Sequence, residues 1–348
     1  MQSGNRLPPK RGRVVAAVAW SMMLAGGVVL WMTALRSLWP PLDVASPLLF
    51  HALALIGIAA ATLLLRARRA FFLLSCLGVL AIAPSVMTLD AREGPASIAL
   101  PWHRPASTRD GVPAVRVLSL NTGHANGDLD RLRRYILLAR ADIVVLSEFG
   151  PNKSELLRQL RRAFPYQAGC SETWACSQVL LSRLPFHRSG TRMPDLDGPP
   201  LVWAEFHFSN ESTAKLTVFG THIYRPSRRH AWHAAQLDGL ARIMQRTEGS
   251  IVVAGDFNMT HLSRSFEEFS AGSGLRASSR TLASWPAWPL PLPQVQLDHV
   301  FVSPDVEVLD QRLGRLVGSD HLPIITSIRL PHAPTLIARS RVGQRSIQ

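Results

Sequence analysis

The chain has 348 residues, a formal net charge of +14 at pH 7 and 47% hydrophobic residues. Charged residues make up 18% of it, below the roughly one quarter that is usual in soluble domains. These figures exclude a disordered chain, a collagen-like repeat, a coiled coil and a disulfide-dense scaffold. The first ninety positions are strongly apolar and almost free of acidic side chains. The composition therefore predicts a globular domain attached to a membrane region.

Three uncharged apolar runs lie within residues 1–89, at about 14–35, 44–65 and 70–89. A bilayer is crossed by about 20 apolar residues in a helix. Buried core helices and a cleaved signal peptide are the alternatives. Apolar runs this long and closely spaced are unusual in a soluble core, and the first is too long for a signal peptide and is followed by two more. We expect three transmembrane helices.

Basic residues flank these runs unevenly. They precede the first run and separate the second from the third, at Arg6, Lys10, Arg11, Arg13, Arg66, Arg68 and Arg69. Only Arg36 lies between the first two runs. Because cytoplasmic loops carry the excess of Lys and Arg, we expect a multi-pass protein of the inner or plasma membrane with a cytoplasmic N-terminus. Three crossings then put the rest of the chain in the periplasm or outside the cell.

Residues 90–113 are rich in Pro, Ser and Arg without periodicity and read as a linker. Residues 114–331 have ordinary globular composition, and residues 332–348 read as a disordered basic tail. Cys170 and Cys176 lie six positions apart in the globular part. In an oxidising compartment they can close a disulfide, and neither has the spacing of a zinc site.

The globular part alternates strand-like and helix-like segments before several strands follow one another. We expect strands at 115–120, 142–147, 178–182, 201–208, 215–221, 251–254, 297–302 and 324–330, and helices at 128–140, 152–163 and 227–247. This order predicts an α/β domain with mixed sheets.

Polar side chains follow several of these strands directly. The segments are LSLNTG with Asn121, VVLSEFG with Glu148, FGTHIYRPS with His222, VVAGDFNMT with Asp256 and Asn258, LDHVFVS with Asp298, and GSDHLPI with Asp320 and His321. Each segment alone is a weak signal, since Asp and Asn favour turns. Together they place acids, histidines and asparagines at strand ends of one domain, which indicates a catalytic cleft.

The residue types fit hydrolysis of a phosphate ester. Mg²⁺ prefers oxygen ligands and keeps several waters, so one or two carboxylates hold it. The cation neutralises charge on the phosphoryl oxygens. A histidine oriented by an aspartate is an acid or base near neutral pH, and asparagine donates to a phosphate oxygen without adding a repelling charge.

The ordered set Asn, Glu, His, Asp-x-Asn, Asp and Ser-Asp-His, which spans about residues 115–330, resembles the endonuclease/exonuclease/phosphatase superfamily. The resemblance implies a four-layer α/β sandwich, two mixed sheets flanked by helices, behind the three transmembrane helices. It also implies cleavage of phosphoester bonds with Mg²⁺, for which Mn²⁺ can substitute. On the metal side, Glu148 resembles the ligand glutamate, Asn121 the asparagine beside it and Asp320 a further metal-side acid.

For the chemical step, Asp256 resembles the aspartate that positions or deprotonates the attacking water, and Asn258 its transition-state-stabilising neighbour. His321 resembles the general acid or base, oriented by Asp298, and His222 matches a second histidine of the nuclease I and sphingomyelinase branches. The resemblance leaves open which group takes the water's proton.

Arg225 follows the His222 strand and can contact a substrate phosphate, although a solvated helix start explains it equally well. We expect a membrane-anchored nuclease first. A phospholipid or sphingomyelin-type phosphodiesterase or a phosphatase is the alternative, and a catalytically silent membrane scaffold is the second alternative. The partners expected are therefore a phosphodiester substrate, nucleic acid or phospholipid, and the bilayer, with no protein partner.

Overall fold

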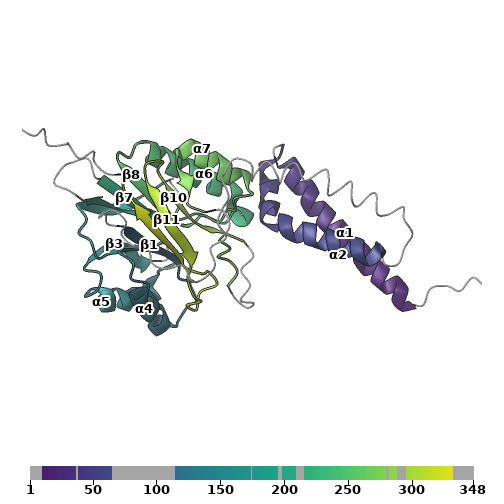
Figure 1. Ribbon diagram of the computed structural model, residues 1–348, viewed down its shortest axis with the longest axis horizontal. Helices are drawn as coiled ribbons and strands as arrows, with labels where there is room; N and C mark the ends of the chain where they lie inside the picture. The colour runs from purple at the N-terminus through teal and green to yellow at the C-terminus, as the bar shows by residue number, and fades with distance from the viewer. Residues whose placement is uncertain are drawn as a thin grey trace, which may run out of the picture.

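The computed structural model describes residues 10–36, 38–64, 114–173, 175–194, 198–208, 215–279, 282–287 and 295–331 (Figure 1). The predicted third span at 70–89, the linker at 90–113 and the tail at 332–348 lie outside the described residues. Within them, a helical hairpin of residues 10–64 adjoins an α/β domain of residues 114–331.

The hairpin consists of α1 (Lys10–Leu35), the 3₁₀ segment η1 (Pro40–Leu48) and α2 (Leu49–Leu64). Two stretches, Arg13–Leu35 and Pro40–Leu63, are long and apolar enough to cross a membrane. Residues 44–48, expected at the start of the second span, belong instead to η1. This segment contains Pro40, Pro41 and Pro47, and a proline cannot donate an α-helical backbone hydrogen bond.

Small residues bring the two hairpin helices close together. Ala19 and Ala59 are buried between them, and a Cβ built on Gly26 would lie 2.9 Å from the carbonyl oxygen of Ala52. Two tryptophans of α1, Trp20 and Trp31, are exposed. The contact between the two helices therefore includes small residues, together with Leu63.

The α/β domain contains two six-stranded sheets. The first has the order β11 (Glu307–Leu313), β12 (Ile324–Arg329), β1 (Val115–Asn121), β2 (Ile143–Ser147), β4 (Cys176–Ser182) and β3 (Tyr166–Thr173). The second has the order β5 (Arg188–Arg192), β6 (Leu201–His207), β7 (Lys215–His222), β8 (Ser250–Asp256), β10 (Asp298–Val302) and β9 (Arg276–Ala277). β1 pairs parallel with β2 and β7 with β8, whereas the other strand pairs are antiparallel. Both sheets are therefore mixed, as predicted.

Helices cover the outer face of each sheet. α4 (Leu129–Leu138) and α5 (Ser154–Leu160), preceded by η2 (Pro151–Lys153), pack on the first sheet, and α6 (Pro226–Gln245) and α7 (Arg264–Ser273) pack on the second. A third apolar cluster, with Val117, Val145 and Val252, fills the space between the sheets. The predicted four-layer sandwich is confirmed.

Several elements were not predicted: β3, β5, β9, β11 and α7. The edge strands β5 (RSGTR) and β11 (EVLDQRL) have few apolar residues, because most of their side chains are not buried. Helix α7 is short and is defined by its ends. Ser263 accepts a hydrogen bond from the backbone N–H of Phe266, and Gly274 ends the helix with a φ of 72°.

The strand registers bring the predicted polar residues to one end of the sandwich. Asn121 lies opposite Ser147 in the first sheet. In the second sheet, Asp256 lies opposite both His222 and Asp298. Since β1, β2, β7 and β8 all end at this edge, their last side chains meet in one place.

Candidate active site

Asn121 joins the two sheets at this edge. Its Nδ2 donates to Glu148 Oε1 at 3.2 Å and to Asp256 Oδ2 at 3.0 Å. Its Oδ1 accepts from the backbone N–H of Gly123 at 3.0 Å, which fixes the orientation of the amide. The two carboxylates therefore approach each other from different sheets, with the amide of Asn121 between them.

Glu148 is held by partners on three sides. Its Oε2 accepts from the backbone N–H of His124 at 2.8 Å and lies 2.6 Å from His124 Nδ1. His222 Nε2 lies 3.7 Å from Oε1. Burial alone would raise the pKa of Glu148, but His222, His124 and the hydrogen bond from Asn121 lower it to about 2. Glu148 is therefore ionised at neutral pH.

A second buried set of side chains lies next to Asp256. Asp298 Oδ2 lies 2.7 Å from His321 Nδ1 and accepts from the Ser284 hydroxyl at 2.6 Å. His321 Nε2 lies 3.8 Å from Asp256 Oδ2. Burial disfavours the charged imidazole, but Asp298 and Asp256 outweigh it and raise the pKa of His321 to about 10. The imidazole is thus oriented by one carboxylate while its other nitrogen faces a second.

Backbone conformation also marks this site. Glu148 and Asn258 have positive φ angles of 52° and 49°, which are costly for residues with a Cβ and concentrate at functional sites. Asn258 is held by its backbone N–H, which donates to Asp256 Oδ1 at 2.9 Å, and by its Nδ2, which donates to the carbonyl of Ile223 at 2.9 Å. At Gly255, a Cβ would collide with the carbonyl oxygen of Thr221. Glycine lets β7 and β8 approach just before Asp256.

These residues fit a divalent cation. Glu148 Oε1 and Asp256 Oδ2 each lie 3.7 Å from His222 Nε2 and share the amide of Asn121. Burial raises the pKa of Asp256, and the charge of Asp298 adds to this. A cation would offset both effects, and carboxylate oxygens are the ligands Mg²⁺ prefers. Asn121, expected as a ligand, presents its nitrogen rather than its oxygen to the carboxylates.

A comparison with protein families agrees with this geometry. The profile described as the Endonuclease/Exonuclease/phosphatase family matches residues 118–321. The chain belongs to this family. The match includes all the predicted site residues, from Asn121 to His321. A search of curated proteins gives no match. Family membership makes the chain a hydrolase of phosphoric esters by class.

Several solved structures share the fold at low sequence identity. D. rerio TDP2, complexed with a single-strand DNA product, is 17% identical with a TM-score of 0.51, over 62% of this chain and 99% of that one. A family protein from Bacteroides vulgatus is 18% identical with a TM-score of 0.52, over 63% and 99%. One from Bacteroides thetaiotaomicron is 15% identical with a TM-score of 0.50, over 64% and 99%.

Within this family fold, the site includes residues that sequence reasoning missed. His124 contacts Glu148, Ser284 contacts Asp298, and Lys153 is buried with its Nζ 3.3 Å from the carbonyl oxygens of Glu148 and His124. His124 and Ser284 lie in loops without a recognisable motif. The one available signal was the position of His124, three residues after Asn121.

Other predicted residues lie around this centre. Asp320 accepts a hydrogen bond from the indole N–H of Trp285 at 3.1 Å, so its metal role stays a prediction. Arg225 precedes α6 and lines a cavity next to the catalytic residues. Cys170 on β3 is joined to Cys176 on β4 by a disulfide, with 5.5 Å between their Cα atoms.

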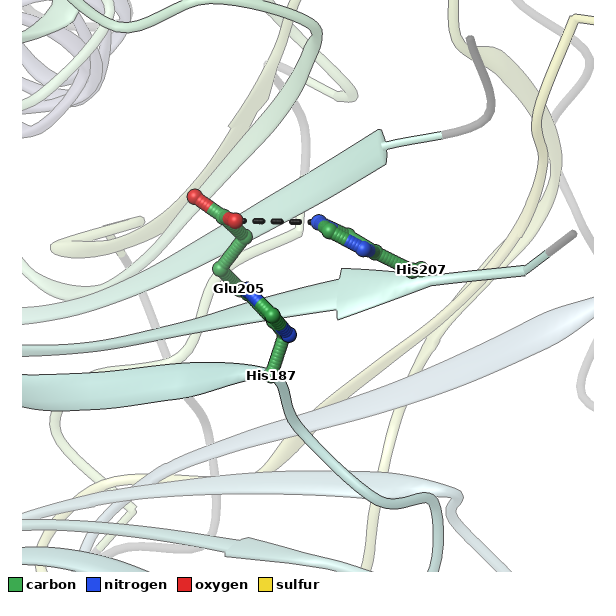
Figure 2. Close-up of side chains that lie close together, drawn as sticks. All are labelled: His187, Glu205 and His207. Carbon is green, nitrogen blue, oxygen red and sulfur yellow. Dashed lines mark hydrogen bonds and ion pairs between the residues drawn. The ribbon is translucent and has the colours of Figure 1, made fainter. Parts of the chain in front are cut away.

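Two groups of His, Asp and Glu side chains lie close enough to hold a metal ion: Asp256, Asp298 and His321 of the site above, and His187, Glu205 and His207, just before β5 and on β6 (Figure 2). In the second group, the two imidazoles are stacked 4.5 Å apart, and His207 Nε2 lies 3.0 Å from Glu205 Oε1. The other oxygen of Glu205 already pairs with Lys215 at 2.9 Å and Arg188 at 3.2 Å. Burial would raise the pKa of Glu205, but these partners lower it to about 2. A cation here would adjoin two positive charges, so we interpret the group as a clamp between strands β5, β6 and β7.

Proposed function

We propose that the protein is a Mg²⁺-dependent phosphodiesterase. The observation that carries this proposal is the convergence of Glu148 and Asp256 opposite the His321–Asp298 pair. Two carboxylates suit a hard cation, and an oriented imidazole beside them suits proton transfer. The same observation argues against a catalytically silent scaffold, because such a scaffold does not require an ionised Glu148 or an imidazole held by Asp298.

In this proposal, Glu148 and Asp256 would hold the cation, with Asp320 as a further acidic group, and Asn121 positions the two carboxylates. When bound, the cation neutralises charge on the phosphoryl oxygens. Asp256 accepts the proton of the attacking water, and His321, held by Asp298, donates a proton to the leaving oxygen. Asn258 and His222 contact the phosphoryl group. Arg225 contacts another oxygen of the substrate phosphate.

The test is hydrolysis of bis(p-nitrophenyl) phosphate by the purified full chain in detergent with Mg²⁺. We expect release of p-nitrophenol that Asp256→Asn abolishes, because that change removes the carboxylate shared by the cation and His321. Absence of hydrolysis above buffer in a folded wild-type sample, with either Mg²⁺ or Mn²⁺, would refute the proposed function.

We also propose that the hairpin crosses the inner or plasma membrane with the catalytic domain on the outer side. Its apolar helices support this, and η1 contacts the catalytic domain through Asp43. The hairpin turn and the catalytic domain then share one side of the bilayer, while α2 ends on the other. The predicted span at 70–89 supplies the crossing that this arrangement needs. The Cys170–Cys176 pair fits an oxidising compartment.

The orientation can be tested with reporters joined after residue 113. Alkaline phosphatase, which is active only outside the cytoplasm, is expected to be active there, and green fluorescent protein exported in unfolded form is expected to be dark. A fusion after residue 66 serves as the opposite control. Fluorescence at 113 together with inactive phosphatase would reverse the proposed topology.

Two substrate classes are compatible with this chemistry. The basic charge of the chain favours nucleic acid, as does the single-strand DNA product bound to D. rerio TDP2, which shares the fold. The membrane hairpin beside the cleft favours a phospholipid. The cavity between the hairpin and the catalytic residues bears directly on the choice between nucleic acid and phospholipid.

A further inference from the structure

A cavity of about 290 Å³ lies between the catalytic residues and the turn of the hairpin. His321 and Asn258 line one part of it, and Val44, Pro47 and Leu48 of η1 line another. Residues far apart in the sequence thus form a single pocket. In Figure 1 the turn of the hairpin lies beside α6 and α7, on the side of the domain where this pocket is found.

The turn is fixed in place by Asp43, the single acidic residue among the first 89. Its carboxylate accepts from the backbone N–H of Arg264 at 3.1 Å and of Ser265 at 3.3 Å, at the start of α7. Ser46 donates to the same carboxylate at 2.7 Å. Asp43 is 7% exposed. A buried carboxylate at a helix N-terminus is well stabilised, so the contact holds η1 against the catalytic domain.

The pocket has two kinds of wall. Arg225 lines the pocket together with His321 and Asn258, and its guanidinium group suits a phosphate. From the hairpin, the apolar side chains of Val44, Pro47 and Leu48 line it, beside Asp43, whose carboxylate is bound to the start of α7. Leu48 ends η1 and is 48% exposed, directly before the apolar helix α2. A ligand that fills this pocket needs an anionic group at one end and an apolar group at the other.

We propose that the substrate is a lipid phosphodiester of the surrounding membrane, whose apolar part rests on Val44, Pro47 and Leu48 while its phosphate reaches His321. This inference rests on the proposed phosphodiesterase activity. Water attacks the phosphorus, the P–O bond to the leaving alcohol breaks, and that alcohol takes up a proton, so that one phosphate monoester and one alcohol are formed. A nucleic acid has no apolar end to occupy the η1 wall.

The test compares three probes offered to the purified full chain with Mg²⁺: dioleoylphosphatidylglycerol in mixed micelles, bis(p-nitrophenyl) phosphate and a single-stranded oligonucleotide. The variant is Leu48→Trp, which narrows the apolar part of the pocket. Leu38→Trp is the matched control, because Leu38 is also an exposed leucine of the hairpin turn but does not line the pocket. The measured quantity is the ratio of kcat/KM for the lipid to kcat/KM for the small ester.

We expect wild type to hydrolyse the lipid and Leu48→Trp to lower the ratio about tenfold, as a misfit in an apolar pocket does. Leu38→Trp should leave the ratio unchanged. The inference is overturned if wild type cleaves the small ester but not the lipid, if only the oligonucleotide is cut, or if both variants have the wild-type ratio. Failure on all three probes would refute the phosphodiesterase proposal itself.

Two variants of Asp43 distinguish the effect of the position of the turn from the effect of its apolar side chains. Asp43→Ala removes the contact with α7, whereas Asp43→Asn keeps a hydrogen-bonding oxygen. We expect the alanine variant to raise KM for the lipid about tenfold with little change in kcat, and the asparagine variant to restore most of the loss. An equal loss in kcat for both esters would contradict a role in lipid binding.

Discussion

Replacement of His321 by asparagine is expected to lower kcat for phosphodiester hydrolysis by about 10²- to 10⁴-fold, the usual contribution of a general acid or base. An asparagine amide can still donate to Asp298, so the buried carboxylate keeps a partner, but the amide cannot transfer a proton. The measurement is steady-state kinetics on bis(p-nitrophenyl) phosphate, with circular dichroism to verify folding.

His299→Asn is the matched control for this change. His299 is also fully buried, but its Nε2 lies 2.9 Å from the carbonyl oxygen of Met259 and its ring packs among Phe257, Phe266 and Phe301. We expect this variant to lose stability and to keep kcat within a few fold. Comparable losses of kcat in both variants, or near-normal turnover in His321→Asn, would refute the role of His321.

Replacement of Glu148 by glutamine is expected to raise the Mg²⁺ concentration needed for half-maximal activity at least tenfold. The pKa of Glu148 is lowered to about 2, so the wild-type side chain carries a full negative charge at neutral pH, and glutamine keeps its shape without that charge. Loss of this carboxylate removes one of the few anionic ligands that the proposed cation site offers. The change in Mg²⁺ requirement is measured by titrating the activity with Mg²⁺. Calorimetry measures the change in Mg²⁺ affinity.

Glu205→Gln provides the control for the loss of a buried carboxylate. Glu205 also has a pKa lowered to about 2, but it lies in the clamp with Lys215 and Arg188. This variant should lose stability and keep the wild-type Mg²⁺ requirement. If Glu148→Gln shows the same Mg²⁺ dependence as wild type, Glu148 does not bind the cation.

Much of the sandwich was predictable because its central strands are runs of β-branched and aliphatic residues bounded by polar turns. The β1, β2, β7 and β8 strands were expected within one or two residues of their observed bounds. Strands β5 and β11 were not, because they lie at sheet edges where few side chains are buried. Their pairing depends on neighbouring strands rather than on their own residue pattern.

The same distinction applies to the site. The positions of Asn121, Glu148 and Asp256 were predictable, because each lies at or just after the end of a central strand. The end of the strand fixes where such a side chain lies. The partners His124 and Ser284 come from loops, and their contacts depend on tertiary structure. Local sequence also carries no sign that Asp43 accepts hydrogen bonds at the start of a helix more than 200 residues away.

The contact of Asp43 with α7 has a consequence for the biogenesis of the protein. During synthesis the hairpin leaves the ribosome well before α7, so η1 is made long before its partner exists. The backbone N–H groups of Arg264 and Ser265 become available only when α7 has formed, after most of both sheets has been synthesised. The apolar wall of the pocket therefore joins the catalytic residues late, and a chain interrupted before α7 has a membrane hairpin but no completed pocket.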